Sequence, residues 1–134
     1  METINDFEDL QVWRLAREQC KEVSCYLIKF LAKREFELIS QIKRSSGSVM
    51  DNIAEGYERG GNSEFIFFLG IAKGSNGELR SQFWRALDLD LISHENFSNF
   101  IEKNKIIGKR INSFILYLKN SELKGIKFKK KNES

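Results

Sequence analysis

The sequence predicts an all-α protein whose helices form an antiparallel up-down-up-down four-helix bundle. Its 134 residues include no proline, the residue that most often interrupts a helix. Apolar residues recur at three- and four-residue steps in four segments, which is the periodicity of amphipathic helices. The connections between these segments are short, and short connections make consecutive helices antiparallel neighbours. A chain of this length forms one domain and can bury a core without metals or disulfides.

The first two helices are expected over about Phe7–Leu31 and about Glu35–Tyr57. Asp6 is the expected N-cap of the first helix, because its carboxylate accepts a hydrogen bond from a free backbone N–H. The second helix is expected to end before the turn at Gly60 and Gly61. The apolar stripes of the two helices are Leu10, Trp13, Ala16, Cys20, Val23, Leu27 and Phe30, and Leu38, Ile42, Val49 and Ile53.

The third helix is expected to start after Asn62 or Ser63 and to continue to about Leu91. The fourth is expected to start at Ser93, a good N-cap, and to continue to about Lys119. These elements define a bundle domain over residues 1–120 and a basic, flexible tail over residues 121–134. The two apolar stripes are Phe65, Phe68, Leu69, Ala72, Leu79, Phe83, Ala86 and Leu87, and Phe97, Phe100, Ile101, Ile107, Ile111, Phe114, Ile115 and Leu118.

Small and polar residues lie on the facing sides of the second and third helices, where leucines would be usual. Antiparallel pairing about the glycine turn brings them together and predicts a close-packed polar seam, with Glu78 reaching Gln41 or Arg44. Gly74 and Gly77 each cost about 1 kcal/mol relative to alanine in a helix, which suggests that a side chain there would collide with a neighbour. The alternative is a polar pocket between the helices. The seam residues are Ser45, Asn52, Glu55, Gly74, Ser75 and Glu78.

The run from Phe65 to Leu69 is apolar on more than one helix face. A helix of a small bundle buries only one stripe, so the surplus residues Ile66, Phe67 and Ile71 are expected to form a subunit interface. The alternative is a central helix that is covered on all sides by its own chain. An interface between identical chains predicts a homo-oligomer with closed rotational symmetry.

The constellations that carry catalysis or bind metals are missing from the sequence. His94 is the only histidine, which excludes the paired-histidine sites of zinc and di-iron proteins. Cys20 and Cys25 point in different directions on a helix, so we expect two reduced, mostly buried thiols, as in a cytoplasmic protein. The sequence shows neither a signal peptide nor a membrane-spanning run. We therefore expect a cytoplasmic protein without enzymatic activity, cofactor or metal.

The formal net charge of +3 is distributed unevenly along the chain. Residues 1–102 carry 12 basic and 17 acidic side chains, a net charge of −5, whereas residues 103–134 carry 10 basic and 2 acidic ones, a net charge of +8. This segment is either a solvated face or a surface for phosphate backbones, and copies around one axis would strengthen its field. The candidate nucleic-acid-binding residues are Lys103, Lys105, Lys109, Arg110, Lys119, Lys124, Lys127, Lys129, Lys130 and Lys131.

Several sequence blocks resemble the bacterial four helix bundle family, also called the 23S rRNA-intervening-sequence proteins. They include Asp9-Leu10-x-Val12-Trp13, Gln41-Ile42-Lys43-Arg44-Ser45, Asn52-Ile53-Ala54-Glu55-Gly56 and Ile71-Ala72-x-Gly74-Ser75. The resemblance covers about Phe7 to Leu118. It implies an up-down bundle that assembles as a homopentameric ring. It also implies similarity to the accessory protein of diversity-generating retroelements, whose basic ring binds a reverse transcriptase and nucleic acid.

Three hypotheses about function follow. The first is a non-enzymatic homo-oligomer that binds structured RNA, or DNA, through the basic residues of the fourth helix and the tail. The second is a protein-interaction scaffold, such as a reverse transcriptase accessory protein. The third is a small enzyme or ligand-binding protein that uses Asn52, Glu55, Ser75 and Glu78 of the seam. No membrane partner is expected.

Overall fold

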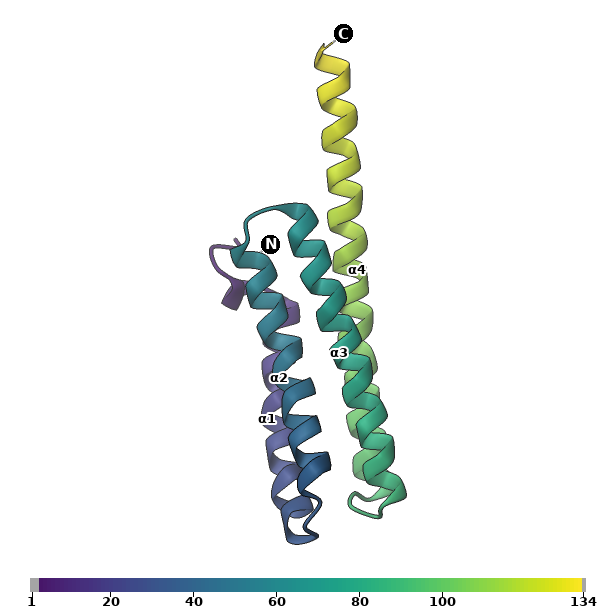
Figure 1. Ribbon diagram of the computed structural model, residues 1–134. Helices are drawn as coiled ribbons and strands as arrows, with labels where there is room; N and C mark the ends of the chain where they lie inside the picture. The colour runs from purple at the N-terminus through teal and green to yellow at the C-terminus, as the bar shows by residue number, and fades with distance from the viewer. Residues whose placement is uncertain (1–2, 134) are drawn as a thin grey trace.

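The computed structural model describes the backbone of residues 3–133 and the side chains of residues 3–121. This part of the chain forms a short 3-10 helix, η1 (Phe7–Asp9), followed by α1 (Gln11–Ala32), α2 (Phe36–Glu58), α3 (Asn62–Asp88) and α4 (His94–Glu133). Neighbouring helices run antiparallel, with short turns between them (Figure 1). The prediction of an all-α four-helix bundle is confirmed, and the ring assembly stays a prediction.

The start of the first helix differs from the prediction. Asp6 caps η1 instead of α1, and its carboxylate accepts a hydrogen bond from the Phe7 N–H at 2.8 Å. The chain is extended at Leu10, with φ −72° and ψ 127°, before α1 begins. The side chain of Leu10 is 6% exposed and packs in a core cluster with Val12 and Ala16. The helix is thus interrupted at Leu10, where the side chain is buried, and the spacing of apolar residues alone does not reveal this interruption.

The last helix is longer than the predicted segment. Ser93 caps α4 as expected, since its hydroxyl accepts a hydrogen bond from the Asn96 N–H at 3.1 Å. The helix continues past Lys119 to Glu133 and projects beyond the α2–α3 turn (Figure 1). The side chains of residues 122–134 lie outside the described part, and the flexibility of the 121–134 segment stays a prediction.

Polar residues from all four helices divide the hydrophobic core into two clusters. One cluster includes Phe30 of α1, Ile42 of α2 and Phe83 of α3, and the other lies on the opposite side of the polar residues, toward η1. We call the intervening residues the polar layer. Its members are all at most 5% exposed: Gln19 of α1, Ser45 and Ser46 of α2, Asn76 of α3 and Asn104 of α4.

Candidate nucleic-acid interface

The predicted basic residues of α4 lie on different sides of that helix. Lys103 faces α1, where its Nζ lies 3.5 Å from Glu22 Oε2. Arg110 also reaches α1, and its guanidinium is 3.5 Å from Gln11 Oε1. Lys105 and Lys109 instead line a groove between α3 and α4. Lys119 is exposed, and the side chains of Lys124, Lys127, Lys129, Lys130 and Lys131 lie outside the described residues.

The α3/α4 groove, with a volume of about 500 Å³, is basic and polar. Lys73 and Arg80 enter it from α3, opposite Lys105 and Lys109 from α4, and no Asp or Glu among the described side chains lines it. None of the four forms an ion pair with a carboxylate among the described side chains. The groove therefore concentrates positive charge that the surrounding described residues leave uncompensated.

Glycines keep this groove open. Gly77 of α3 and Gly108 of α4 both line it, and a Cβ atom at Gly77 would meet no atom within 4 Å. A Cβ atom at Gly108 would lie 3.4 Å from the Asn76 side-chain nitrogen, an ordinary contact. An alanine at either position would therefore occupy part of the groove without a close clash with the described atoms.

One member of the polar layer, Asn76, lines the groove, and another, Asn104, holds Arg80. Asn104 Nδ2 donates to Gln19 Oε1 at 2.9 Å, and Gln19 Nε2 donates to Asn76 Oδ1 at 3.0 Å. Asn76 Nδ2 in turn donates to the Asn104 carbonyl oxygen at 3.0 Å. The Asn104 side-chain oxygen accepts a hydrogen bond from Arg80 at 3.2 Å. A fully buried amide therefore fixes one nitrogen of a guanidinium that also lines the groove.

Sequence reasoning missed Lys73, Arg80, Gln19 and Asn104. Lys73 and Arg80 are seven residues apart, which puts them on one helix face, but their charge is offset in a segment count by nearby acidic residues. Gln19 and Asn104 each occupy a position between apolar residues of a stripe, such as Ile101 and Ile107 around Asn104. A polar residue at such a position on every helix is the signal that would have revealed the polar layer.

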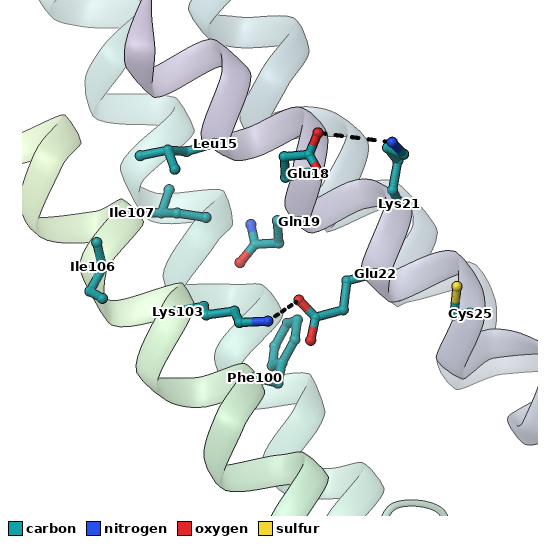
Figure 2. Close-up of a pocket in the computed structure, with 10 residues that line it drawn as sticks. All are labelled: Leu15, Glu18, Gln19, Lys21, Glu22, Cys25, Phe100, Lys103, Ile106 and Ile107. Atoms are coloured by element: carbon teal, nitrogen blue, oxygen red, sulfur yellow. Dashed lines mark hydrogen bonds and ion pairs between the residues drawn. The ribbon is translucent and has the colours of Figure 1, made fainter.

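A second cavity of about 660 Å³ lies between α1 and α4. Its apolar lining includes Leu15, Phe100 and Ile106, and the side chain of Gln19 lies between the two helices (Figure 2). The ion pair of Lys103 with Glu22 spans this α1/α4 cleft (Figure 2). Because its lysines are matched by glutamates, the cleft does not have the uncompensated charge of the α3/α4 groove.

The two cysteines are free, and they differ in exposure. Cys20 is half-buried, and its thiol donates to the Ser46 carbonyl oxygen at 3.0 Å. Burial raises the pKa of this thiol, which makes it a weaker nucleophile at neutral pH. Cys25 is exposed at the α1/α4 cleft, so the expectation that both thiols are mostly buried is wrong for this residue.

The α2–α3 seam is shifted in register relative to the prediction. The hydroxyl groups of Ser48 and Ser75 lie 2.8 Å apart across it, and Arg85 donates to Gln41 Oε1 at 2.7 Å. Glu78 therefore does not reach Gln41 or Arg44, and it accepts instead from Gln82 of its own helix at 3.3 Å.

The other seam residues bond mainly within α2. Ser45 donates to the Gln41 carbonyl oxygen at 3.0 Å, and Asn52 donates to the Ser48 carbonyl oxygen at 2.8 Å. Glu55 is exposed and lies 2.9 Å from the Arg59 guanidinium. The two carboxylates of the hypothetical ligand site, Glu55 and Glu78, are both exposed on the bundle.

Close helix approach depends on a different glycine from those predicted. A Cβ atom at Gly56 would lie 2.8 Å from Phe68 Cβ and 3.0 Å from Phe65 Cδ1. At Gly74 and Gly77 a Cβ atom would meet nothing within 4 Å, so the predicted collision at these positions is wrong within the chain. The reason is that Gly74 is exposed and Gly77 borders the α3/α4 groove, so neither packs in the seam.

The surplus apolar residues of α3 are only partly accounted for by the chain itself. Phe67 is 63% exposed and Ile71 is 38% exposed, whereas Ile66 packs partly against the core. Phe67 contacts the Phe68 ring edge to face, with ring centroids 5.3 Å apart. The residues predicted for a subunit interface therefore include two that leave apolar surface on the described bundle.

Within the described residues, no group of three or more His, Cys, Asp or Glu side chains is arranged to hold a metal ion. A search of the same residues finds no helix with the length and hydropathy needed to cross a membrane.

The arrangement defines a class: an all-α four-helix bundle with a polar layer across its core and a basic groove between its last two helices. Residues 8–113 match the model of the 23S rRNA-intervening sequence protein family, and the chain belongs to that family. The fold is similar to the crystal structure of a protein of unknown function from the S23 ribosomal protein family of Bacteroides thetaiotaomicron VPI-5482. That likeness has a TM-score of 0.73 and 24% identity, and covers 78% of this chain and 97% of the other. No match was found among curated proteins.

Proposed function

We propose that this chain is a non-enzymatic homo-oligomer, encoded in or associated with a 23S rRNA intervening sequence, that binds structured RNA through the basic surface of α4. The observation that carries the proposal is the net charge of +8 on residues 103–134, against −5 on the rest of the chain. Lys105 and Lys109 add support, since they lie together without an ion pair to a described carboxylate. Such a surface binds phosphates and carries no base-reading motif.

Assembly of the chain would multiply this charge. The exposed Phe67 and Ile71 side chains support a contact between sister chains, since a monomer gains nothing from apolar surface in water. Light scattering on the full chain is expected to report a multiple of 15.6 kDa, with a pentamer as the expected state. A particle of 15.6 kDa at micromolar concentration would refute the homo-oligomer.

RNA binding is tested by fluorescence anisotropy with a labelled RNA hairpin over a series of salt concentrations. Because phosphate contacts release counterions, the affinity is expected to fall steeply as salt increases. Truncation after Leu118 removes six of the ten candidate basic residues and is expected to lower both the affinity and the salt dependence. An affinity that is equal at low and high salt would show that the basic surface does not bind RNA.

The alternative function is a protein-interaction scaffold, such as a partner of a reverse transcriptase. The α1/α4 cleft favours it, because Leu15 and Ile106 offer apolar surface with a charged margin, as protein interfaces do. A scaffold should retain a specific protein partner after nuclease treatment, whereas a partner held through RNA should be lost.

A further inference from the structure

The α3/α4 groove brings together basic residues that the charge count along the sequence did not group. Its cations come from two helices, Lys73 and Arg80 from α3 and Lys105 and Lys109 from α4. On α4, Lys103 and Arg110 differ from Lys105 and Lys109, because each of the first two interacts with a side chain of α1. The basic residues of α4 are therefore of two kinds. Lys103 and Arg110 are turned toward α1, whereas Lys105 and Lys109 face the groove and are free to contact an anion.

We propose that the α3/α4 groove holds the sugar–phosphate backbone of an RNA strand, and that Arg80 is its fixed contact. This inference rests on the proposed RNA-binding function and names the site at which it occurs. Lys73 and Arg80 are seven residues apart, so at about 1.5 Å per residue the groove follows the helix axis for about 10 Å. This length exceeds the width of a single phosphate group, so consecutive phosphates of one strand can contact the groove.

The lining favours a polyanion over other occupants. Besides its cations, the described residues that line the groove are glycine, asparagine and serine, and none of them is apolar. Sites for small organic ligands are mostly apolar, and surfaces that bind membranes insert apolar side chains between lipids. Gly77 and Gly108 leave room for a backbone to approach the helices closely. Asn112 Oδ1 accepts a hydrogen bond from Lys73 Nζ at 3.0 Å, which leaves the Asn112 amide nitrogen and the Ser113 hydroxyl for sugar hydroxyls.

Arg80 is held in place before the RNA arrives. One nitrogen of its guanidinium donates to Asn104 Oδ1 at 3.2 Å, and Asn104 is fully buried in the polar layer. A guanidinium has five N–H donors, so others remain for phosphate oxygens. Asn104 is thus a positioning residue: it does not contact RNA, and it acts by holding the side chain that does.

The test compares two double variants of the full chain with equal changes in charge. Lys105→Gln with Lys109→Gln removes two groove cations, and Lys103→Gln with Arg110→Gln removes two cations of α4 that face α1. The probe is a labelled single-stranded RNA of twelve nucleotides. With about 0.7 counterions released per phosphate contact, loss of two contacts lowers the salt slope by about 1.4, and affinity at 150 mM salt falls by roughly tenfold. The control pair is expected to lose less than a third of that slope.

The outcomes distinguish this inference from the function on which it rests. Equal losses in the two double variants overturn the groove as the site while leaving RNA binding intact. No salt-dependent binding by the unmodified chain overturns the proposed function itself. A mononucleotide that competes as well as the oligonucleotide overturns a strand as the occupant. Phosphatidylserine vesicles that bind with the same dependence on Lys105 and Lys109 overturn RNA in favour of a membrane surface.

The role of Asn104 is tested by a double-mutant cycle with Arg80. Arg80→Gln is expected to weaken binding, whereas Arg85→Gln, at an exposed arginine of the same helix that bonds to Gln41, is the matched control. Asn104→Ala is expected to weaken binding in the unmodified chain but to have no further effect beside Arg80→Gln. Additive losses overturn the positioning role. If Asn104→Ala does not fold, equal effects of Arg80→Gln and Arg85→Gln still overturn the Arg80 contact.

Discussion

Two glycine-to-alanine substitutions should change the stability of the bundle in opposite directions. At Gly56 the added Cβ would lie 2.8 Å from Phe68 Cβ, an atom next to the backbone that moves only if α3 moves. Overpacking of this kind costs about 1 to 3 kcal/mol, and the helix propensity of alanine returns about 1. Since the contact is with a Cβ atom and not the end of a flexible side chain, we expect a net loss of about 1 to 2 kcal/mol.

Gly74→Ala is the matched variant. The new methyl group would meet nothing within 4 Å, so only the propensity gain of about 1 kcal/mol applies. The two variants should therefore differ by about 2 to 3 kcal/mol in unfolding free energy. Urea titration followed by circular dichroism measures this, and with a slope of about 2 kcal/mol per molar urea the midpoints should differ by about 1 M. A loss at Gly74 equal to that at Gly56 would refute the reasoning.

Two further predictions concern the polar layer and the cysteines. Asn104→Ala removes partners from Gln19 and Arg80 and should lower the unfolding free energy by about 2 to 4 kcal/mol, measured by urea titration, whereas Asn112→Ala should have little effect. Iodoacetamide at pH 8 should alkylate Cys25 faster than Cys20, detected by peptide mass spectrometry. Because burial raises the pKa of Cys20, its contribution to stability is retained at neutral pH and lost as pH rises through that elevated pKa.

The helices could be predicted from the sequence because each of them buries a periodic apolar stripe. Ile42, Val49 and Ile53 lie on the buried side of α2 as expected, and Phe83 and Ala86 on that of α3. The break in the helix at Leu10 could not be predicted, because an apolar residue fits equally well in a helix or in an extended segment that buries it. The continuation of α4 past Lys119 was missed because the apolar stripe ends there.

The sequence predicts the candidate site only as an excess of positive charge on residues 103–134. Counting charges identified Lys105 and Lys109, but their neighbours Lys73 and Arg80 come from a helix about thirty residues earlier in the chain. The predicted register of α2 against α3 is wrong because it places the centre of the hairpin at the Gly60-Gly61 turn. Arg85, not Glu78, is the residue opposite Gln41. Pairing between helices depends on how the turn is built, which residue spacing alone does not determine.

The buried amides across the middle of the bundle fix how far along its axis each helix lies relative to its neighbours. If one helix slid along its neighbours by a turn, about 5.4 Å, its amide would enter a region of phenylalanine and isoleucine side chains. Each amide left without its hydrogen-bond partner would lower the stability of the fold by about 1 to 3 kcal/mol. This is a large share of the unfolding free energy of a small domain, about 5 to 15 kcal/mol. Surface lysines can therefore be exchanged freely while the helices that carry them stay in one alignment.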